Sequence, residues 1–220
     1  MKICFLVSGG GGNLKFLHQA LSQGIISNLE LSVVADRDCD AIRFSQKNGL
    51  HSNLIEYSRS NPGMLRDVLD SIGPDIIVTN WHKIIDADTV DSYSNKMINL
   101  HYSLLPAFGS LIGVEPIKKA YEKGCKFIGP TCHFVDEGVD TGDIIAQAIF
   151  MTNIPYEDAI TKMFRMGCLT LLNGIVQVAN ENILNQGLIL NIPTDSFYCP
   201  DLNFNPTNFN EIFWNKLASL

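Results

Sequence analysis

Short apolar runs alternate with segments of helical periodicity over the first half of the chain. Val, Ile and Leu occupy consecutive positions of these runs, as in strands buried on both faces: KICFLVS, LELSVVAD, PDIIVTN and KMINLH. A further short strand is expected near NLIEY. Residues 13–23, 40–49 and 62–73 place apolar side chains at helical spacing between the runs. This alternation predicts an α/β fold, with a doubly wound, mostly parallel sheet between layers of helices.

The second half of the sequence predicts a different succession of elements. Residues 115–124 predict a short helix, and residues 126–138 and 143–151 predict two strands joined through VDTG. A long helix is predicted from about Pro155 to Gln186, because its apolar residues keep helical spacing. The aromatic-rich tail beyond it is expected to be ordered only where it packs on the domain or on a partner.

The length and charge of the chain limit what it can be. Its 220 residues, 46% of them hydrophobic, can bury a core without metal or disulfides. We predict a main domain over residues 1–187 and a C-terminal tail over residues 188–220 that serves packing or oligomerisation. The net charge is −7 without a Lys/Arg cluster, so neither nucleic acid nor a membrane is an expected partner. Scattered cysteines without CxxC spacing, and an N-terminal apolar run too short for a signal peptide, favour a reducing, cytoplasmic location.

A run of glycines separates the first expected strand from the first expected helix in VSGGGGNL. Glycine lets backbone N–H groups approach an anion, and the helix N-terminus adds the positive end of its dipole. The stretch is not a P-loop, because no Lys-Ser/Thr follows it, and it does not match GxGxxG. One interpretation is a tight turn without a ligand. The favoured one is a phosphate site for a phosphate-bearing small molecule, built from Gly10, Gly11, Gly12 and Asn13.

Asn99 and His101 interrupt the last apolar strand of the first half, in INLHYSLLP. Residues two apart on a strand point to the same face, so these side chains share one face at the carboxyl end of the strand, where α/β sheets bind ligands. Further along, HFVDEGVDTGD carries His133 and a Gly-flanked Asp140, which its loop would project back over the same edge. An amide, an imidazole and a carboxylate are therefore expected close together.

Three chemistries and one structural role are open to these polar residues. A metal site would use His101, His133 and Asp140, but no short HxH or HExxH spacing supports it. A Cys132–His133 nucleophilic pair is disfavoured, because neighbours on a strand point to opposite faces. In acyl transfer without an enzyme nucleophile, the Asn99 amide and a His N–H would stabilise an oxyanion while a carboxylate orients the imidazole. In the structural role, Asn99 and His101 only cap the strand.

Three motifs resemble, in order and spacing, those of the formyltetrahydrofolate-dependent formyltransferases: SGGGGNL, INLHYSLLPAF and CHFVDEGVDTGDIIAQ. Within this family they are similar to the glycinamide ribonucleotide formyltransferases and to the related formyltetrahydrofolate deformylases. The resemblance runs from Met1 to about Gln186. It implies a Rossmann-like formyltransferase fold with 10-formyltetrahydrofolate as co-substrate and no metal. It also implies that Asn99, His101 and Asp140 are the catalytic residues.

In this family a primary amine attacks the formyl carbon of the folate. The resemblance implies that the His101 imidazolium and the Asn99 amide bind the developing oxyanion, while Asp140 holds His101 and assists proton transfer. Loss of one such donor raises the barrier by about 3 kcal/mol. The pteridine is implied to lie against backbone and apolar side chains of two segments, namely Trp81, His82, Lys83, Ile84 and Ile85 together with Val139 and Thr141. Core packing is the alternative role of the tryptophan.

Two positions and one loop depart from the glycinamide ribonucleotide enzymes. Gly12 stands where they have Ser, and Cys168 lies at or near their ribose-contacting acidic residue. The loop after Pro106 shares LPAF with the deformylases. We expect an N-formyltransferase that acts on a primary amine of a phosphate-bearing small molecule, either glycinamide ribonucleotide of purine biosynthesis or a similar compound.

Three other functions stay open. The acceptor would instead be a nucleotide-linked amino sugar, or water would replace the amine as in the deformylases. Deformylases carry an N-terminal regulatory domain whereas this sequence opens on the first strand, so transfer is expected rather than hydrolysis. The third is a non-catalytic, nucleotide-binding α/β module, which would not need Asn99, His101 and Asp140 together. The tail is expected to contribute to acceptor choice or to a homodimer.

Overall fold

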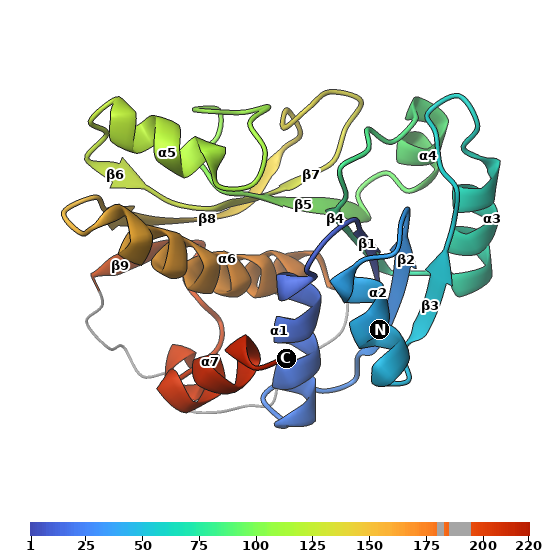
Figure 1. Cartoon of the computed structure of the whole chain (residues 1–220), viewed down its shortest axis with the longest axis horizontal. Helices are drawn as coiled ribbons and strands as arrows, with labels where there is room; N and C mark the ends of the chain where they lie inside the picture. The colour runs from blue at the N-terminus through green and yellow to red at the C-terminus, as the bar shows by residue number, and fades with distance from the viewer. Residues whose placement is uncertain (180–182, 185–194) are drawn as a thin grey trace.

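The computed structural model describes residues 1–179, 183–184 and 195–220. In this part of the chain one sheet of nine strands has the order β3-β2-β1-β4-β5-β7-β8-β6, with β9 paired to β8 (Figure 1). The strands are β1 (Lys2–Val7), β2 (Glu30–Ala35), β3 (His51–Leu54), β4 (Ile76–Asn80), β5 (Met97–His101), β6 (Phe127–Ile128), β7 (Thr131–Phe134), β8 (Ile144–Met151) and β9 (Ser196–Cys199). The helices are α1 (Gly12–Ser22), α2 (Asp40–Lys47), α3 (Gly63–Ile72), α4 (Ala87–Ser92), α5 (Glu115–Glu122), α6 (Tyr156–Val178) and α7 (Glu211–Ala218), with a 3-10 turn at Pro206–Asn208.

The five strands from β3 to β5 pair in parallel. The chain lays down β1, β2 and β3 in one direction, and then adds β4 and β5 on the other side of β1. The strand order therefore reverses between β1 and β4. Open α/β sheets bind ligands outside the carboxyl ends of the strands at such a reversal. The predicted doubly wound, mostly parallel sheet is confirmed, and its reversal lies where the glycine turn follows β1.

Helices cover both faces of the parallel sheet (Figure 1). On β1, Ile3 and Phe5 belong to the core that packs under α1, α2 and α6, whereas Cys4 and Leu6 belong to the core under α3 and α4. Successive residues of a strand point to opposite faces, so an apolar run such as this one fills both cores. A third core joins α5 and α6 to the antiparallel strands β6 and β8.

The single strand predicted over residues 126–138 is wrong, because two short strands occupy it. Gly129 and Pro130 separate β6 from β7. Pro130 has no N–H for a sheet ladder, and a side chain on Gly129 would collide with the backbone of Ala148 on β8. Strands β7 and β8 then pair antiparallel, as the two predicted strands joined through VDTG require.

The long helix α6 ends at Val178 rather than near Gln186. Ala179 has extended backbone angles (φ −66°, ψ 133°). Ile183 is 1% exposed, and its carbonyl accepts a hydrogen bond from Ser27 N at 2.9 Å. The side chain of Ile183, which keeps helical spacing in the sequence, is thus buried beside the end of α1. Residues 180–182 and 185–186 of the predicted helix, and the predicted boundary at 187/188, lie outside the described residues.

The described part of the tail packs on the domain. On α1, the ring of Phe16 lies 5.2 Å from Phe209, 5.7 Å from Phe213 and 5.8 Å from Trp214, centroid to centroid. The side chain of Gln19 donates to Phe213 O at 2.6 Å. This aromatic cluster orders the tail, as expected, while its role in a homodimer stays a prediction. In the part of the chain that the structure describes, no helix is long and apolar enough to span a membrane.

Candidate active site

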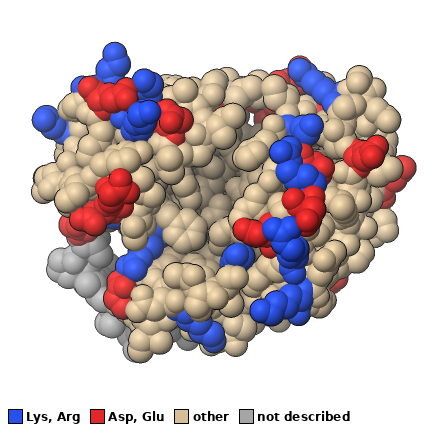
Figure 2. All heavy atoms as spheres, in the orientation of Figure 1, with Lys and Arg blue, Asp and Glu red and all other residues tan. Residues whose placement is uncertain are grey.

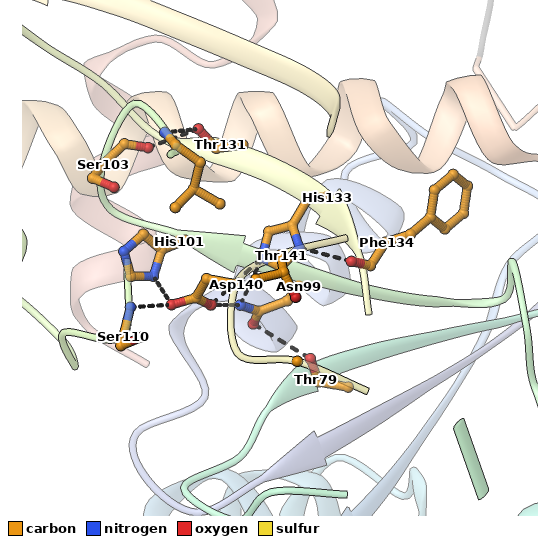
Figure 3. A network of polar contacts seen from close by, with 12 residues as sticks. Thr79, Asn99, His101, Ser103, Ser110, Thr131, His133, Phe134, Asp140 and Thr141 are labelled. Carbon is orange, nitrogen blue, oxygen red and sulfur yellow. Dashed lines mark hydrogen bonds and ion pairs between the residues drawn. The ribbon is translucent and has the colours of Figure 1, made fainter. Parts of the chain in front are cut away.

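A row of polar side chains crosses three neighbouring strands. Asn99 on β5 lies opposite Thr79 on β4 and opposite His133 on β7. Thr79 Oγ1 donates to Asn99 Oδ1 at 3.3 Å (Figure 3). The carbonyl end of the Asn99 amide is therefore turned to β4, and its NH2 group faces the opposite side of the row. As predicted, His101 shares this face, whereas Ile98 and Leu100 belong to the core on the other face.

A short loop between β7 and β8 brings Asp140 back over this row. Asp136 Oδ1 closes the loop by accepting hydrogen bonds from Gly138 N at 3.0 Å and from Thr141 Oγ1 at 2.7 Å. Asp140 itself takes a left-handed backbone conformation with φ 58°, which Asp tolerates better than most side chains. The loop thus projects the carboxylate over the end of β5, as the glycine-flanked sequence predicted.

The three side chains predicted to be catalytic lie together. Asp140 Oδ2 is 3.3 Å from His101 Nδ1, and Asp140 Oδ1 accepts from Asn99 Nδ2 at 3.4 Å (Figure 3). Ser110 N donates to Asp140 Oδ2 at 2.8 Å, and His133 Nε2 lies 3.6 Å from Asp140 Oδ1. Each carboxylate oxygen therefore faces two nitrogen atoms. The catalytic roles of these residues stay predictions, but the geometry that they need is present.

The environment of Asp140 keeps its carboxyl group ionised. Burial by itself would raise the pKa of Asp140, since only 11% of the side chain is exposed. Hydrogen bonds from His133 and from Ser110 N, and positive charge on His101 and His133, outweigh this effect, so the pKa lies below its usual value. Asp140 is therefore an acceptor at neutral pH, suited to hold an imidazole.

His101 contacts acceptors with both ring nitrogens. Its Nδ1 faces Asp140, and its Nε2 lies 3.1 Å from the carbonyl oxygen of Phe108. A neutral imidazole has one N–H and bonds one acceptor, whereas an imidazolium has an N–H for each. Phe108 (φ 57°) and Ser110 (φ 65°) adopt left-handed backbone conformations that non-glycine residues seldom take. The loop after Pro106 thus touches the candidate site through one carbonyl and one N–H.

His133 supports the Asn99 amide. Its Nδ1 lies 2.7 Å from the carbonyl oxygen of Phe134, which only accepts, so Nδ1 carries a proton. In the neutral ring Nε2 then accepts from Asn99 Nδ2 at 3.3 Å, whereas in the imidazolium Nε2 faces Asp140 Oδ1 as a donor at 3.6 Å. Cys132, its neighbour, points to the opposite face and is fully buried, and burial raises the pKa of its thiol to about 12. The geometric argument against a Cys132–His133 pair is therefore confirmed.

Among the described residues, no group of three His, Cys, Asp or Glu side chains is placed to hold a metal ion.

A cavity of about 620 Å³ opens beside this cluster. The segment between β4 and α4 lines it with most of the residues predicted to bind folate, namely Trp81, His82, Lys83, Ile84 and Ile85, and the Asp140 loop adds Val139. Ile84 and Val139 are about half exposed at its rim. Thr141 does not line the cavity, since its hydroxyl bonds Asp136 within the loop. Trp81 also packs on Tyr57, with ring centroids 4.9 Å apart.

A second, smaller cavity of about 200 Å³ lies at the glycine turn. Gly10, Gly11, Gly12 and Asn13 line it, and phosphate binding by these residues stays a prediction. Gly11 is the left-handed N-cap of α1 (φ 68°), and Ala41 lies too close for a side chain at this position. The two cavities adjoin, because both are lined by Asn13, Asn80, His82 and Tyr102. Figure 2 shows the face hollowed near its centre, with uncharged residues around the hollow.

Thr79, Phe108 and Ser110 contribute to the site and were not predicted. The sequence places Thr79 only within a buried strand, although a hydroxyl in the run PDIIVTN is a signal once β4 is known to adjoin β5. Phe108 and Ser110 act through a backbone carbonyl and a backbone N–H, which no pattern of side chains reveals. All three depend on which strands and loops become neighbours in the fold.

Comparisons with known proteins agree with this geometry. Residues 1–165 match the family described as formyl transferase. The chain is 33% identical over 157 residues to the chloroplastic phosphoribosylglycinamide formyltransferase of Arabidopsis thaliana, covering 67% of this chain and 54% of that protein. It is 34% identical over 118 residues to the formyltetrahydrofolate deformylase of Haemophilus influenzae, covering 53% and 40%. The chain thus spans about half the length of the curated relatives that it matches.

A solved structure gives the same result for the fold. The crystal structure of glycinamide ribonucleotide transformylase 1 from Symbiobacterium toebii superposes with a TM-score of 0.72 at 26% identity, over 84% of this chain and 94% of that one. The matched family covers three quarters of the sequence and contains both the glycine turn and the Asn99–His101–Asp140 cluster. The chain belongs to the formyl transferase family.

Proposed function

We propose that the protein is an N-formyltransferase that moves the formyl group of 10-formyltetrahydrofolate to a primary amine on a phosphate-bearing small molecule. One observation carries the proposal. The Asp140–His101 pair and the Asn99 amide line the larger cavity, which adjoins the cavity at the glycine turn. A donor in the larger cavity and an acceptor at the glycine turn would meet at this cluster.

The residues of the cluster supply what acyl transfer to an amine needs. As the amine nitrogen attacks the formyl carbon, the C=O electron pair moves onto the formyl oxygen. N–H groups of His101 and Asn99 are the donors available to that oxyanion, and such donors lower the barrier when they are fixed in advance. The ionised Asp140 receives the proton that the amine loses. Collapse of the adduct then breaks the bond to the folate nitrogen, which takes up the proton held by Asp140, so that the carboxylate is regenerated.

The larger cavity suits a folate donor. Its apolar rim at Ile84 and Val139 and the ring of Trp81 provide surface for a flat heterocycle, and the backbone of residues 81–85 provides polar groups. The names of the Arabidopsis and Symbiobacterium relatives favour glycinamide ribonucleotide as the acceptor. A nucleotide-linked amino sugar is the alternative acceptor for the same three catalytic residues.

Hydrolysis of 10-formyltetrahydrofolate is the second candidate function. Its support is the similarity to deformylases and the LPAF sequence that precedes the loop touching His101. The same donors would stabilise the oxyanion, and Asp140 would take a proton from water rather than from an amine.

An amine screen with 10-formyltetrahydrofolate tests the proposal and separates these candidates. Consumption of the folate is followed with glycinamide ribonucleotide, with nucleotide-linked amino sugars and without any amine, and the formylated product is identified by mass spectrometry. Amine-dependent consumption with a formylated product supports the transferase. Equal consumption without amine establishes the hydrolase, and no consumption in any arm, with folate binding intact, leaves a non-catalytic module as the function.

A further inference from the structure

Gly12 in the smaller cavity and Gly167 on the buried side of α6 each face an aromatic ring. A Cβ atom on Gly12 would lie 2.7 Å from Cε2 of Phe164, and one on Gly167 would lie 2.9 Å from Cε1 of Tyr102. These separations are below a normal carbon–carbon contact, so each ring occupies space that any side chain at the paired glycine would need. Both rings line the cavity at the glycine turn. Phe164 from α6 and Tyr102 from the end of β5 therefore form an aromatic wall.

Besides the two rings, the described lining of this cavity consists of Val7, the glycines of the turn, Asn13, Asn80 and His82, and it carries no Lys, Arg, Asp or Glu. The amides of Asn13 and Asn80 bond each other, with Asn13 Nδ2 donating to Asn80 Oδ1 at 3.2 Å. Asn13 Oδ1 also accepts from the buried thiol of Cys168 at 3.6 Å. Both ends of the Asn13 amide are thus bonded within the protein. A sugar whose hydroxyls need partners would lose water here with few groups to replace it.

We infer that this cavity takes the acceptor as a phosphate ester of an uncharged ring, with the phosphate at the glycine turn and an apolar face of the ring on Phe164 and Tyr102. The inference rests on the proposed function, since it describes the acceptor of that reaction. Backbone N–H groups at the start of α1 bind the anion. Aromatic rings favour the C–H or π face of another ring over a hydroxylated surface. The preferred amine is therefore carried by a ring with an apolar face, and this preference runs against glycinamide ribonucleotide, the ribose phosphate that the relatives' names favour.

The tail holds the aromatic wall in place. Trp214 of α7 meets Phe164 edge to face, with centroids 6.5 Å apart, and stacks on Phe16 at 5.8 Å. The guanidinium of Arg165 lies 5.4 Å from the centre of the Trp214 ring and is bound by both carboxylate oxygens of Glu211. Phe164 is thus supported from behind by residues far away in the sequence. A wall fixed in this way binds a ring without first having to be ordered.

Binding of simple phosphate esters to the full chain tests the inference without any turnover. Calorimetry compares phenyl phosphate, methyl phosphate and ribose 5-phosphate. We expect phenyl phosphate to bind about three- to tenfold more tightly than methyl phosphate, in line with the strength of aromatic pairs, and more tightly than ribose 5-phosphate. Ribose 5-phosphate binding as tightly as phenyl phosphate would overturn the inference, as would the absence of binding by all three esters.

Two variants test whether the preference for phenyl phosphate arises from the aromatic wall. Phe164→Leu keeps apolar volume but removes the ring, and should abolish most of the preference for phenyl over methyl phosphate. Gly12→Ala displaces the Phe164 ring through its added Cβ and should do the same, so it serves as an independent route if Phe164→Leu does not fold. Phe197→Leu is the matched control, because Phe197 is 71% exposed on β9 and does not line the cavity. If folded Phe164→Leu or Gly12→Ala protein kept the full preference for phenyl over methyl phosphate, the proposed role of the aromatic wall in binding would be refuted.

The outcomes also separate this inference from the proposed function. If phenyl phosphate binds as expected but no amine is formylated, the ring site stands and the transferase proposal fails. If glycinamide ribonucleotide is formylated and ribose 5-phosphate binds best, the transferase proposal stands and the ring site fails.

Discussion

Replacing Asp140 by Asn tests the centre of the proposed mechanism with little change of shape. Asn is as large as Asp and tolerates the left-handed backbone angle at this position (φ 58°), whereas Ala would be strained there. Its carbonyl oxygen would still accept from Ser110 N and His101 Nδ1. Its NH2 group would face His133 Nε2, which accepts in the neutral ring, but it would replace the oxygen that accepts from Asn99 Nδ2, so one hydrogen bond is lost. The fold should persist, with a loss of unfolding free energy of about 1 kcal/mol.

The catalytic effect follows from the lost charge. Asp140 Oδ2 lies 3.3 Å from His101 Nδ1. With an effective dielectric constant of about 20–40, two unit charges at this distance attract by about 2.5–5 kcal/mol. The Asn side chain keeps the hydrogen bond but not this attraction, so His101 becomes a poorer oxyanion donor and no carboxylate receives the proton of the amine. The barrier should rise by about 3–4 kcal/mol, a decrease in kcat on the order of 10²–10³-fold.

The measurement is the initial rate of 10-formyltetrahydrofolate consumption with the amine that the screen identifies. Asp143→Asn is the matched control, because it removes the same charge from an exposed position at the end of the same loop. Folding is checked by circular dichroism and urea denaturation. Equal kcat for the wild type, Asp143→Asn and Asp140→Asn would show that Asp140 has no catalytic role and that the reasoning from its contacts is wrong.

Three further predictions concern stability and reactivity. The pKa of Asp140 is lowered in the folded state, so its ionised carboxylate stabilises the fold above the usual pKa of Asp, and this stabilisation is lost as the pH falls through the folded pKa. The difference in unfolding free energy between the wild type and Asp140→Asn, measured by urea denaturation, should therefore decrease from pH 6 to pH 3. Trp214→Ala should lower the unfolding free energy by about 3–5 kcal/mol, measured in the same way, and a change within error would show that the tail does not stabilise the domain. Iodoacetamide should alkylate exposed Cys199 but spare native Cys4 and Cys132, where burial raises the thiol pKa to about 12; peptide mass spectrometry decides, and equal labelling would contradict the buried positions.

The sequence predicted the parallel half of the fold because burial on both faces leaves a strong signal. A strand such as β1 must supply both cores and is therefore apolar at nearly every position. Short elements leave no comparable signal. The six-residue α4 and the four-residue β9 were not predicted, since tertiary contacts rather than periodicity stabilise segments of this length. The helix was predicted beyond Val178 because Ile183 keeps helical spacing. Its side chain is apolar for another reason, namely that it is buried beside the end of α1.

The candidate site was predictable to the extent that its residues share one strand. The period of two placed Asn99 and His101 on one face, and the structure confirms this arrangement. The row from Thr79 to His133 depends on β5 lying between β4 and β7, and sequence spacing does not specify strand order. The pairing of Gly12 with Phe164 joins residues that are far apart in the sequence, and neither residue alone indicates an aromatic wall.

The contacts of His101 explain why its effect as an oxyanion donor would be confined to the transition state. His101 Nε2 bonds the neutral carbonyl of Phe108, whereas Asn99 Nδ2 already donates to the ionised Asp140 as well as to His133. In the proposed reaction the formyl oxygen gains full negative charge only as the amine attacks. Hydrogen bonds to a charged acceptor are roughly twice as strong as those to a neutral one, so exchanging the Phe108 carbonyl for a neutral formyl oxygen brings little gain. The same exchange becomes strongly favourable once the oxygen is charged, and interactions that strengthen only at that stage are the ones that raise kcat.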